Sequence, residues 1–222
     1  MRTLVEPRRV YGRRYKPLGT TRQAAMQKLP EVAINLDNVI TGSIDPINLF
    51  PDHARQSIHV EIGFGTGEHL AALSAAYPDH VFLGAETYHA GVSYLLKRMQ
   101  ADNLSNIRIY PDDGLALLQA LKTASIDHAY LLFPDPWPKT HHHKRRFVQT
   151  ETLTEFARVL CSGGTLLLAS DDAPLVAWMK RHMAECPDFA PAPNYAHRPQ
   201  TRYAAKALAA GKPLSYLPFM RR

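Results

Sequence analysis

The sequence predicts an α/β fold: an open, mostly parallel sheet with helices on both faces. Short β-branched runs alternate with helical periodicity from residue 58 onward, and a glycine-rich turn follows the first run. Hydrophobic residues make up 45% of the 222 residues, which is enough to bury a sizeable core. In folds of this kind, ligands bind outside the carboxyl ends of the strands.

Each expected strand is a short apolar run, and each expected helix follows a turn or a polar residue. Pro78 ends the first of these helices, and the turn at 162–164 ends the fourth. The expected strands are 58–62, 81–85, 107–110, 128–133 and 165–170. The expected helices are 68–77, 88–101, 114–122, 147–160 and 174–184. Beyond residue 184 the chain is Pro-rich, and the pattern assigns no element.

The length fits one ordinary domain with an N-terminal extension. Residues 1–57 form a basic N-terminal extension that is partly flexible, with one helix around 23–29, and residues 58–222 form the main domain. Cys161 and Cys186 are too few for a disulfide framework or a zinc cluster, so we expect them to be packed only. The sequence shows no bilayer-spanning run and no secretory leader, which indicates a soluble, cytoplasmic protein.

Positive charge is concentrated in three segments. Residues 1–30, 139–146 and 198–222 carry formal charges of +7, +4 and +6, although the whole chain carries only +6. The rest of the chain is therefore acidic. This distribution predicts a polyanionic partner that is bound by particular surfaces. The alternatives are solvated basic tails or, at the Arg-rich start, an organelle transit peptide, which the lack of Ser enrichment disfavours.

The turn after the first strand predicts a cofactor site. Gly63, Gly65 and Gly67 are spaced G-x-G-x-G, not as the dinucleotide pattern G-x-G-x-x-G. Glu61 lies beside this loop, where a carboxylate suits an ammonium group better than a pyrophosphate. Glu86 ends the second strand, at the place where an acid accepts hydrogen bonds from ribose hydroxyls. These features favour S-adenosylmethionine over a dinucleotide.

Asp113 extends this pattern to the third strand. It follows that strand directly, where it could accept a hydrogen bond from an adenine amino group. Carboxyl ends of parallel strands meet at one edge of a sheet, so Asp113 is expected beside Glu86 and the glycine loop.

A proline-rich turn after the fourth strand predicts the reacting end. Asp135 stands between two prolines, which restrict its backbone, and Trp137 offers a flat face on which an extruded base could stack. Lys139 and the basic residues at 144–146 suit phosphate contacts. The alternative is that Asp135 caps the following segment and Trp137 belongs to the core.

The run His141-His142-His143 predicts donors to nucleic acid and no metal site. Three consecutive imidazoles cannot surround one ion in a regular element, and no acid is close in the sequence.

These segments together resemble the bacterial tRNA (guanine-N7-)-methyltransferase family. The resemblance rests on 61–67, on 84–86 and above all on 134–139 with 142–146, and it covers the chain from about residue 55 to the C-terminus. It implies a class I, Rossmann-like methyltransferase fold and methylation of guanine N7 in the variable loop of tRNA with S-adenosylmethionine. It also implies RNA binding and a role in tRNA modification.

The resemblance implies a role for each group of site residues. Asp135 is the catalytic residue and also a cofactor-site acid, and the other cofactor residues are Glu61, Gly63, Gly65, Gly67, Glu86 and Asp113. The substrate-binding positions are Lys139, Asp171, Thr201, Arg202 and Tyr203. The RNA-binding positions are His141, His142, His143, Lys144, Arg145 and Arg146.

Two positions depart from the family pattern. Ala204 stands where the family has an acidic substrate contact, and His141 stands where a basic Arg is common. Two alternatives therefore stay open: a small-molecule methyltransferase, and a non-catalytic RNA-binding protein on the same fold. A monomer and a homodimer are both compatible with the sequence.

Overall fold

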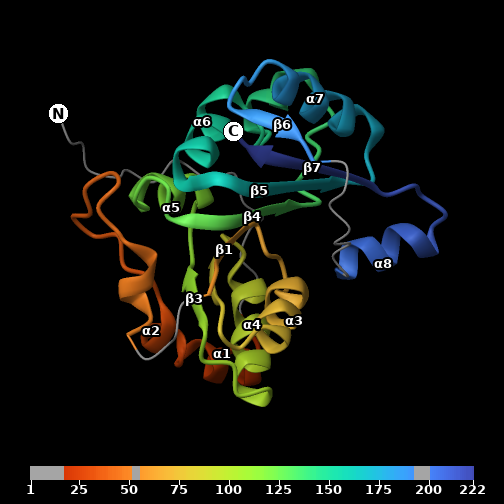
Figure 1. Ribbon diagram of the computed structural model, residues 1–222. Helices are drawn as coiled ribbons and strands as arrows, with labels where there is room; N and C mark the ends of the chain where they lie inside the picture. The colour runs from red at the N-terminus through yellow and green to blue at the C-terminus, as the bar shows by residue number, and fades with distance from the viewer. Residues whose placement is uncertain (1–17, 52–55, 193–200) are drawn as a thin grey trace.

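The computed structural model of this chain describes residues 18–51, 56–192 and 201–222. A seven-stranded sheet with the order β3-β2-β1-β4-β5-β7-β6 runs through the molecule (Figure 1). The strands are β1 (Ile58–Ile62), β2 (Val81–Ala85), β3 (Ile107–Tyr110), β4 (Ile126–Leu132), β5 (Leu160–Ser170), β6 (Phe189–Pro191) and β7 (Ser215–Arg221). The α-helices are α1 (Thr20–Met26), α2 (Leu29–Val32), α3 (Glu68–Ala76), α4 (His89–Ala101), α5 (Gly114–Ala120), α6 (Thr150–Val159), α7 (Ala173–Ala184) and α8 (Arg202–Ala209). Two 3₁₀ helices, η1 (Pro46–Leu49) and η2 (Thr140–Arg145), complete these elements.

The first five strands are parallel, as the sequence predicts. The carboxyl ends of β1, β2 and β3 are aligned, because Ile62 pairs with Ala85 and Ala85 pairs with Tyr110. On the other side of β1, β4 pairs with both β1 and β5 in parallel. The loops that follow these strands therefore emerge at one edge of the sheet, the carboxyl edge.

Each face of the sheet has its own apolar core. Along β1, Ile58, Val60 and Ile62 pack into one cluster with α5, α6 and α7. The opposite face packs against α1, α3 and α4 (Figure 1). Because side chains alternate along a strand, His59 and Glu61 point to this second face. Both lie buried there.

Three elements begin at residues clearly different from the predicted ones. Helix α6 begins at Thr150 and not at 147, because Gln149 forms a capping box with Thr152. Strand β5 begins at Leu160, so the predicted turn at 162–164 lies inside this strand. Strand β4 begins at Ile126, and the carboxylate of the next residue, Asp127, accepts a 2.8 Å hydrogen bond from the β1 backbone.

The C-terminal region holds elements that the sequence pattern did not predict. Strand β7 is antiparallel to β5 and joins the short β6 to the sheet, and α8 precedes it. Pro218 lies inside β7 and Pro191 ends β6, so the usual sign of a strand is broken in both.

Part of the predicted N-terminal extension packs onto the sheet. The backbone of Ile34 donates to Ile109 at 2.8 Å, and the buried ring of Phe50 lies under the guanidinium of Arg108 at 4.6 Å. Helices α1 and α2 replace the one helix expected around 23–29, and α1 packs against α4. Residues 1–17 lie outside the described ranges, and the boundary at 57 stays a prediction. Within the described ranges, no helix has the length and apolar character that crossing a membrane requires.

Candidate active site

The glycine loop after β1 lies open at the carboxyl edge. Gly63, Gly65 and Gly67 have φ angles of +71°, +60° and +75°, a backbone conformation that favours glycine. A Cβ atom added to Gly63 would meet nothing within 4 Å, so a ligand can approach the backbone there. Gly67 ends the loop and begins α3. The loop therefore has the conformation and the open face that a cofactor needs.

A fourth glycine, which the sequence reasoning missed, holds the loop against α4. Gly91 lies in the first turn of α4, where an added Cβ would overlap the carbonyl oxygen of Gly65. An isolated glycine inside a predicted helix was the available signal.

Glu86 is tied to the same loop by backbone hydrogen bonds. Its carboxylate accepts from the backbone N–H of Gly65 and from that of Tyr88, each at 2.8 Å. Burial raises the pKa of Glu86 above its ordinary value, and these backbone hydrogen bonds oppose the shift. The acid is thus pre-oriented, and additional hydroxyl donors from a ligand would favour its charged form.

Two more of the predicted cofactor acids, Glu61 and Asp113, are buried close to the carboxyl ends of β1 and β3. Asp113 caps the start of α5, where its carboxylate accepts from the backbone N–H of Leu115 at 3.1 Å. Glu61 accepts from Nδ1 of His69 at 2.9 Å, and both side chains are almost fully buried.

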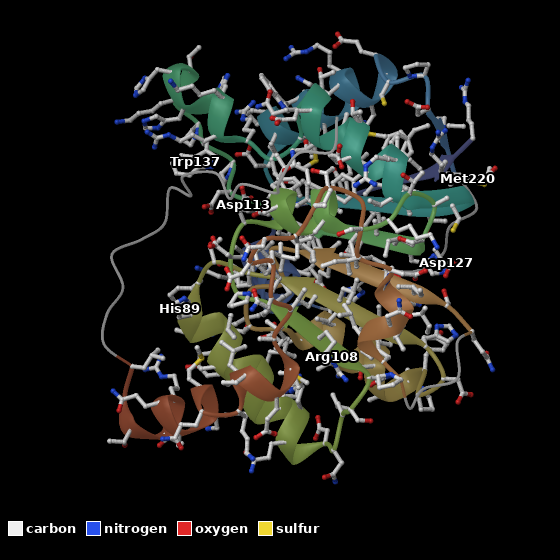
Figure 2. All side chains as sticks on the ribbon, turned by 90° about the vertical axis from the view of Figure 1, so that its left-hand side faces the viewer. His89, Arg108, Asp113, Asp127, Trp137 and Met220 are labelled. Carbon is white, nitrogen blue, oxygen red and sulfur yellow. The ribbon has the colours of Figure 1, made fainter. Side chains whose placement is uncertain are left out.

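The predicted reacting turn lies at the same end of the sheet as these acids. In Figure 2, Asp113 and Trp137 both lie on the side of the molecule opposite Asp127 and Met220. This arrangement follows from the parallel strands, since Asp113 follows β3 and Trp137 follows β4.

The turn that carries Asp135 has a strained backbone. Two bulky residues on either side of it, Phe133 and Trp137, have φ angles of +52° and +43°, which such residues rarely adopt. Asp135 itself is exposed, and its carboxylate has no hydrogen bond or ion pair to any residue of the described ranges. Trp137 is half-buried, with the guanidinium of Arg145 at 5.0 Å from its ring. The turn presents a carboxylate and does not cap a helix.

Arg146 is a buried residue that supports this turn. Its side chain is buried, with the guanidinium 4.8 Å from the ring of Trp178, and its Nε donates to the carbonyl of Pro136 at 2.9 Å. Desolvation lowers the pKa of Arg146 from its ordinary value. The charge pattern could not reveal this burial, and the contact of Arg146 with RNA stays a prediction.

The remaining basic segment surrounds η2. Lys139, His141 and Lys144 are exposed, whereas His142, His143 and Arg145 are half-buried. His142 lies against Trp137 and His141, and slight burial together with nearby positive charge lowers its pKa. The described residues include no cluster of three His, Cys, Asp or Glu that could bind a metal ion.

Helix α8 brings the predicted C-terminal substrate residues to the glycine loop. The exposed ring of Tyr203 lies 3.9 Å from the position of an added Cβ on Gly65. Arg202 is exposed beside it, and the Thr201 hydroxyl caps α8 by accepting from a backbone N–H. Asp171 follows β5 and forms an ion pair with Lys212, with 3.2 Å between Oδ2 and Nζ.

Two cavities have residues of α7 in their walls. A cavity of about 270 Å³ has Asp171, Lys180 and Ser215 in its wall and adjoins the substrate side. A larger cavity of about 500 Å³ lies between α7, β6 and β7, with Cys186 and Phe219 in its wall. Neither contains the glycine loop, Glu86 or Asp113.

Comparisons with known proteins place this arrangement in a family. The chain is 42% identical to a Rhodospirillum rubrum tRNA (guanine-N(7)-)-methyltransferase over 98% of this chain and 89% of that protein. It is 40% identical to the protein of the same name from Agrobacterium fabrum, over 96% of this chain and 94% of that one. A family model described as "Putative methyltransferase" matches residues 55–217.

Solved structures support the fold alone. The 16S rRNA methyltransferase KamB superposes with a TM-score of 0.55 at 14% identity, covering 100% of this chain and 98% of that chain. An rRNA methylase from Streptococcus thermophilus superposes with a TM-score of 0.53 at 14% identity, covering 76% of this chain and 89% of that one. The predicted class I methyltransferase fold is confirmed.

Proposed function

We propose the function from one premise: this chain belongs to the tRNA (guanine-N(7)-)-methyltransferase family. It is an S-adenosylmethionine-dependent enzyme that methylates guanine N7 in tRNA. Within tRNA, we propose the variable loop as the target and the cytoplasm as the place of action. The observation that carries the proposal is that the loops after β1, β2, β3 and β4 bring a glycine turn and acids to one sheet edge.

The residues at this edge fit the cofactor. The open face of Gly63 admits a ligand to the backbone, and Glu86 lies where ribose hydroxyls would donate to it. Asp113 would accept from the adenine amino group, and Glu61 from the ammonium of the methionine head. When bound, the cofactor supplies an electrophilic methyl group on its sulfonium.

The chain has to position the guanine and stabilise charge. Guanine N7 has a free lone pair, so no base has to deprotonate it before it attacks the methyl group. Methyl transfer leaves a positive charge on the purine, and a carboxylate nearby lowers the energy of the transition state. We assign that role to Asp135, which is exposed and has no partner within the described ranges. Trp137 would stack on the base and hold it in line.

The remaining polar residues would bind the rest of the substrate. Asp171 would accept from the guanine N1–H and amino group once Lys212 moves off it. Lys139, Lys144 and the imidazoles of η2 would contact phosphates, which position the RNA without reading its sequence. Ala204 is buried on α8, so this helix offers no acid at the position where the family has one.

Transfer of a labelled methyl group tests the function and its two alternatives. The protein is incubated with labelled S-adenosylmethionine and either bulk tRNA or a metabolite extract. Label in tRNA, at a guanine that becomes sensitive to N7-specific chain cleavage, is the expected result. Label only in the extract would indicate a small-molecule enzyme, and label in neither would indicate a non-catalytic RNA-binding protein.

A further inference from the structure

A buried histidine that the mechanism does not use contacts the cofactor acid of β1. Nδ1 of His69 donates to Oε2 of Glu61 at 2.9 Å, and the exposed fractions of the two side chains are only 3% and 2%. His69 is the one polar partner of the Glu61 carboxylate within the described ranges. A buried carboxylate is costly unless its oxygens accept hydrogen bonds, so His69 offsets part of the cost of keeping Glu61 here.

The backbone places this pair directly behind the glycine loop. Glu61 precedes the loop on β1, and His69 lies in the first turn of α3, which begins immediately after Gly67. The hydrogen bond therefore joins the residue before the glycine loop to a residue just after it. A change in the orientation of either side chain would alter the position of the carboxylate relative to the loop.

Aromatic packing holds the imidazole in one orientation. The ring of Tyr130 meets His69 edge-on, with 4.8 Å between ring centroids and an angle of 75° between planes. Tyr130 is in turn held by His59, whose Nδ1 lies 3.1 Å from the Tyr130 hydroxyl. Nε2 of His59 lies 2.9 Å from Nδ1 of His80, so the network continues to the edge of the buried region.

The hydrogen bond from His69 determines which part of Glu61 a ligand can use. Oε2 is engaged by the imidazole, which leaves Oε1 to accept from an incoming cationic group. A carboxylate held on one oxygen presents the other in a fixed direction, and such preorganisation removes a cost that binding would otherwise carry.

We propose that His69 is a positioning residue for the methionine head group of the cofactor, acting through Glu61. This inference rests on the proposed function, because it assumes that Glu61 accepts from the ammonium of S-adenosylmethionine. It predicts a selective effect: His69 matters for ligands that carry the amino-acid head and not for those that lack it.

Calorimetric titration with two ligands tests this selectivity. S-adenosylhomocysteine carries the amino-acid head, and 5′-methylthioadenosine carries only the nucleoside and the sulfur. We expect His69→Leu to weaken binding of S-adenosylhomocysteine roughly tenfold or more, the scale of one charge-assisted hydrogen bond, and to leave methylthioadenosine within about twofold. His69→Asn, whose amide can donate from nearly the same place, should restore most of the lost affinity.

His128→Leu is the matched control for the loss of a histidine. His128 lies on the same face of the sheet as His59, with 4.6 Å between the two ring centroids. Its Nδ1 forms a hydrogen bond with the hydroxyl of Thr165 and not with Glu61. This variant is expected to lower the midpoint of thermal unfolding without changing the ratio of the two affinities. Equal losses for both ligands in His69→Leu, or no rescue by His69→Asn, would overturn the proposal.

A different result identifies failure of the premise. If Glu61→Gln leaves S-adenosylhomocysteine affinity unchanged while the wild type still methylates tRNA, Glu61 is not the head-group ligand. The proposed role of His69 is then contradicted, and the proposed function is not. If the wild type binds neither ligand, the proposed function itself is contradicted.

Discussion

The three acids proposed to bind the cofactor, which we call the cofactor rim, and Asp135, the acid proposed to act on the substrate, are held in opposite ways. Glu61, Glu86 and Asp113 each accept a hydrogen bond from the protein, so their directions are set before any ligand arrives. Asp135 is exposed, without such a bond in the described ranges, on a turn whose flanking residues Phe133 and Trp137 have positive φ angles. The proposed cofactor side is preorganised through hydrogen bonds, and the proposed reacting side through backbone strain. In this proposal the Asp135 carboxylate stays available to the substrate.

Asp135→Asn should have the largest effect and should separate the two regions. Loss of the carboxylate removes stabilisation of the charge that develops on guanine, so the single-turnover methylation rate should fall by about 10²–10³-fold. Affinity for S-adenosylhomocysteine should change only a few-fold, because the rim acids remain. Rapid-quench methyl transfer and calorimetry measure the two quantities.

Asp102→Asn is the matched control for this substitution. Asp102 is an exposed acid at the end of α4, away from the carboxyl edge, and its loss should leave both quantities at wild-type values. A near-normal rate in Asp135→Asn would show that the reacting turn does not provide the charge stabilisation.

Gly91→Ala should damage the cofactor rim and leave the reacting turn intact. The added methyl group would overlap the carbonyl of Gly65, so the loop has to move, and overpacking of this kind costs about 1–3 kcal/mol in the free energy of unfolding. Binding of S-adenosylhomocysteine should weaken more than tenfold. Gly19→Ala, where an added Cβ meets nothing within 4 Å, is the control. Unchanged affinity in Gly91→Ala would mean that the loop is not held by α4.

Arg146→Ala and Lys144→Ala should distinguish support of the turn from contact with RNA. Loss of Arg146 leaves the Pro136 carbonyl without its donor and should lower both the free energy of unfolding, by about 1–3 kcal/mol, and the methylation rate.

Loss of the exposed Lys144 should only weaken tRNA binding and reduce the slope of log affinity against log salt by roughly 0.7–0.9. Filter binding at several salt concentrations, together with thermal unfolding, checks both. A wild-type methylation rate in Arg146→Ala would rule out the supporting role.

The smallest effect concerns the pH dependence of the rim. Burial raises the pKa of Glu86, so this acid takes up a proton at a higher pH than an ordinary glutamate. In the ligand-free protein, the raised pKa stabilises the folded state relative to the unfolded state at low pH. This contribution to the free energy of unfolding is lost as the pH rises through the raised pKa. The protonated form accepts fewer hydrogen bonds, so S-adenosylhomocysteine affinity should fall as the pH drops, by at most about tenfold per unit.

Glu86→Gln should remove this pH dependence. Calorimetry at matched ionic strength, from the ordinary glutamate pKa up to neutral pH, compares the variant with the wild type. A wild-type pH profile in the variant would assign the dependence to another group.

Periodicity and strand-end chemistry were enough to predict much of the fold. The parallel strands β1 to β5, the glycine loop and the positions of Glu86 and Asp113 after their strands all follow from local patterns. Strand β7 did not, because Pro218 interrupts its pattern and its place between β5 and β6 depends on long-range pairing.

The supporting contacts of the site could not be predicted, because they join segments far apart in the sequence or depend on burial. In the sequence His69 is an ordinary helix residue, and only the structure shows its hydrogen bond to Glu61. Arg146 looks like one more charge in a basic run until the ring of Trp178 is found against it. A sequence shows which groups are present, whereas burial decides which of them face a ligand.

A crystal structure of the protein with S-adenosylhomocysteine tests the central claim most directly. We expect ribose hydroxyls on Glu86, the adenine amino group near Asp113, and the sulfur facing the Asp135 turn across the open side of Gly63. A ligand bound instead in the cavity near Cys186 and Phe219, with the glycine loop uncovered, would contradict it.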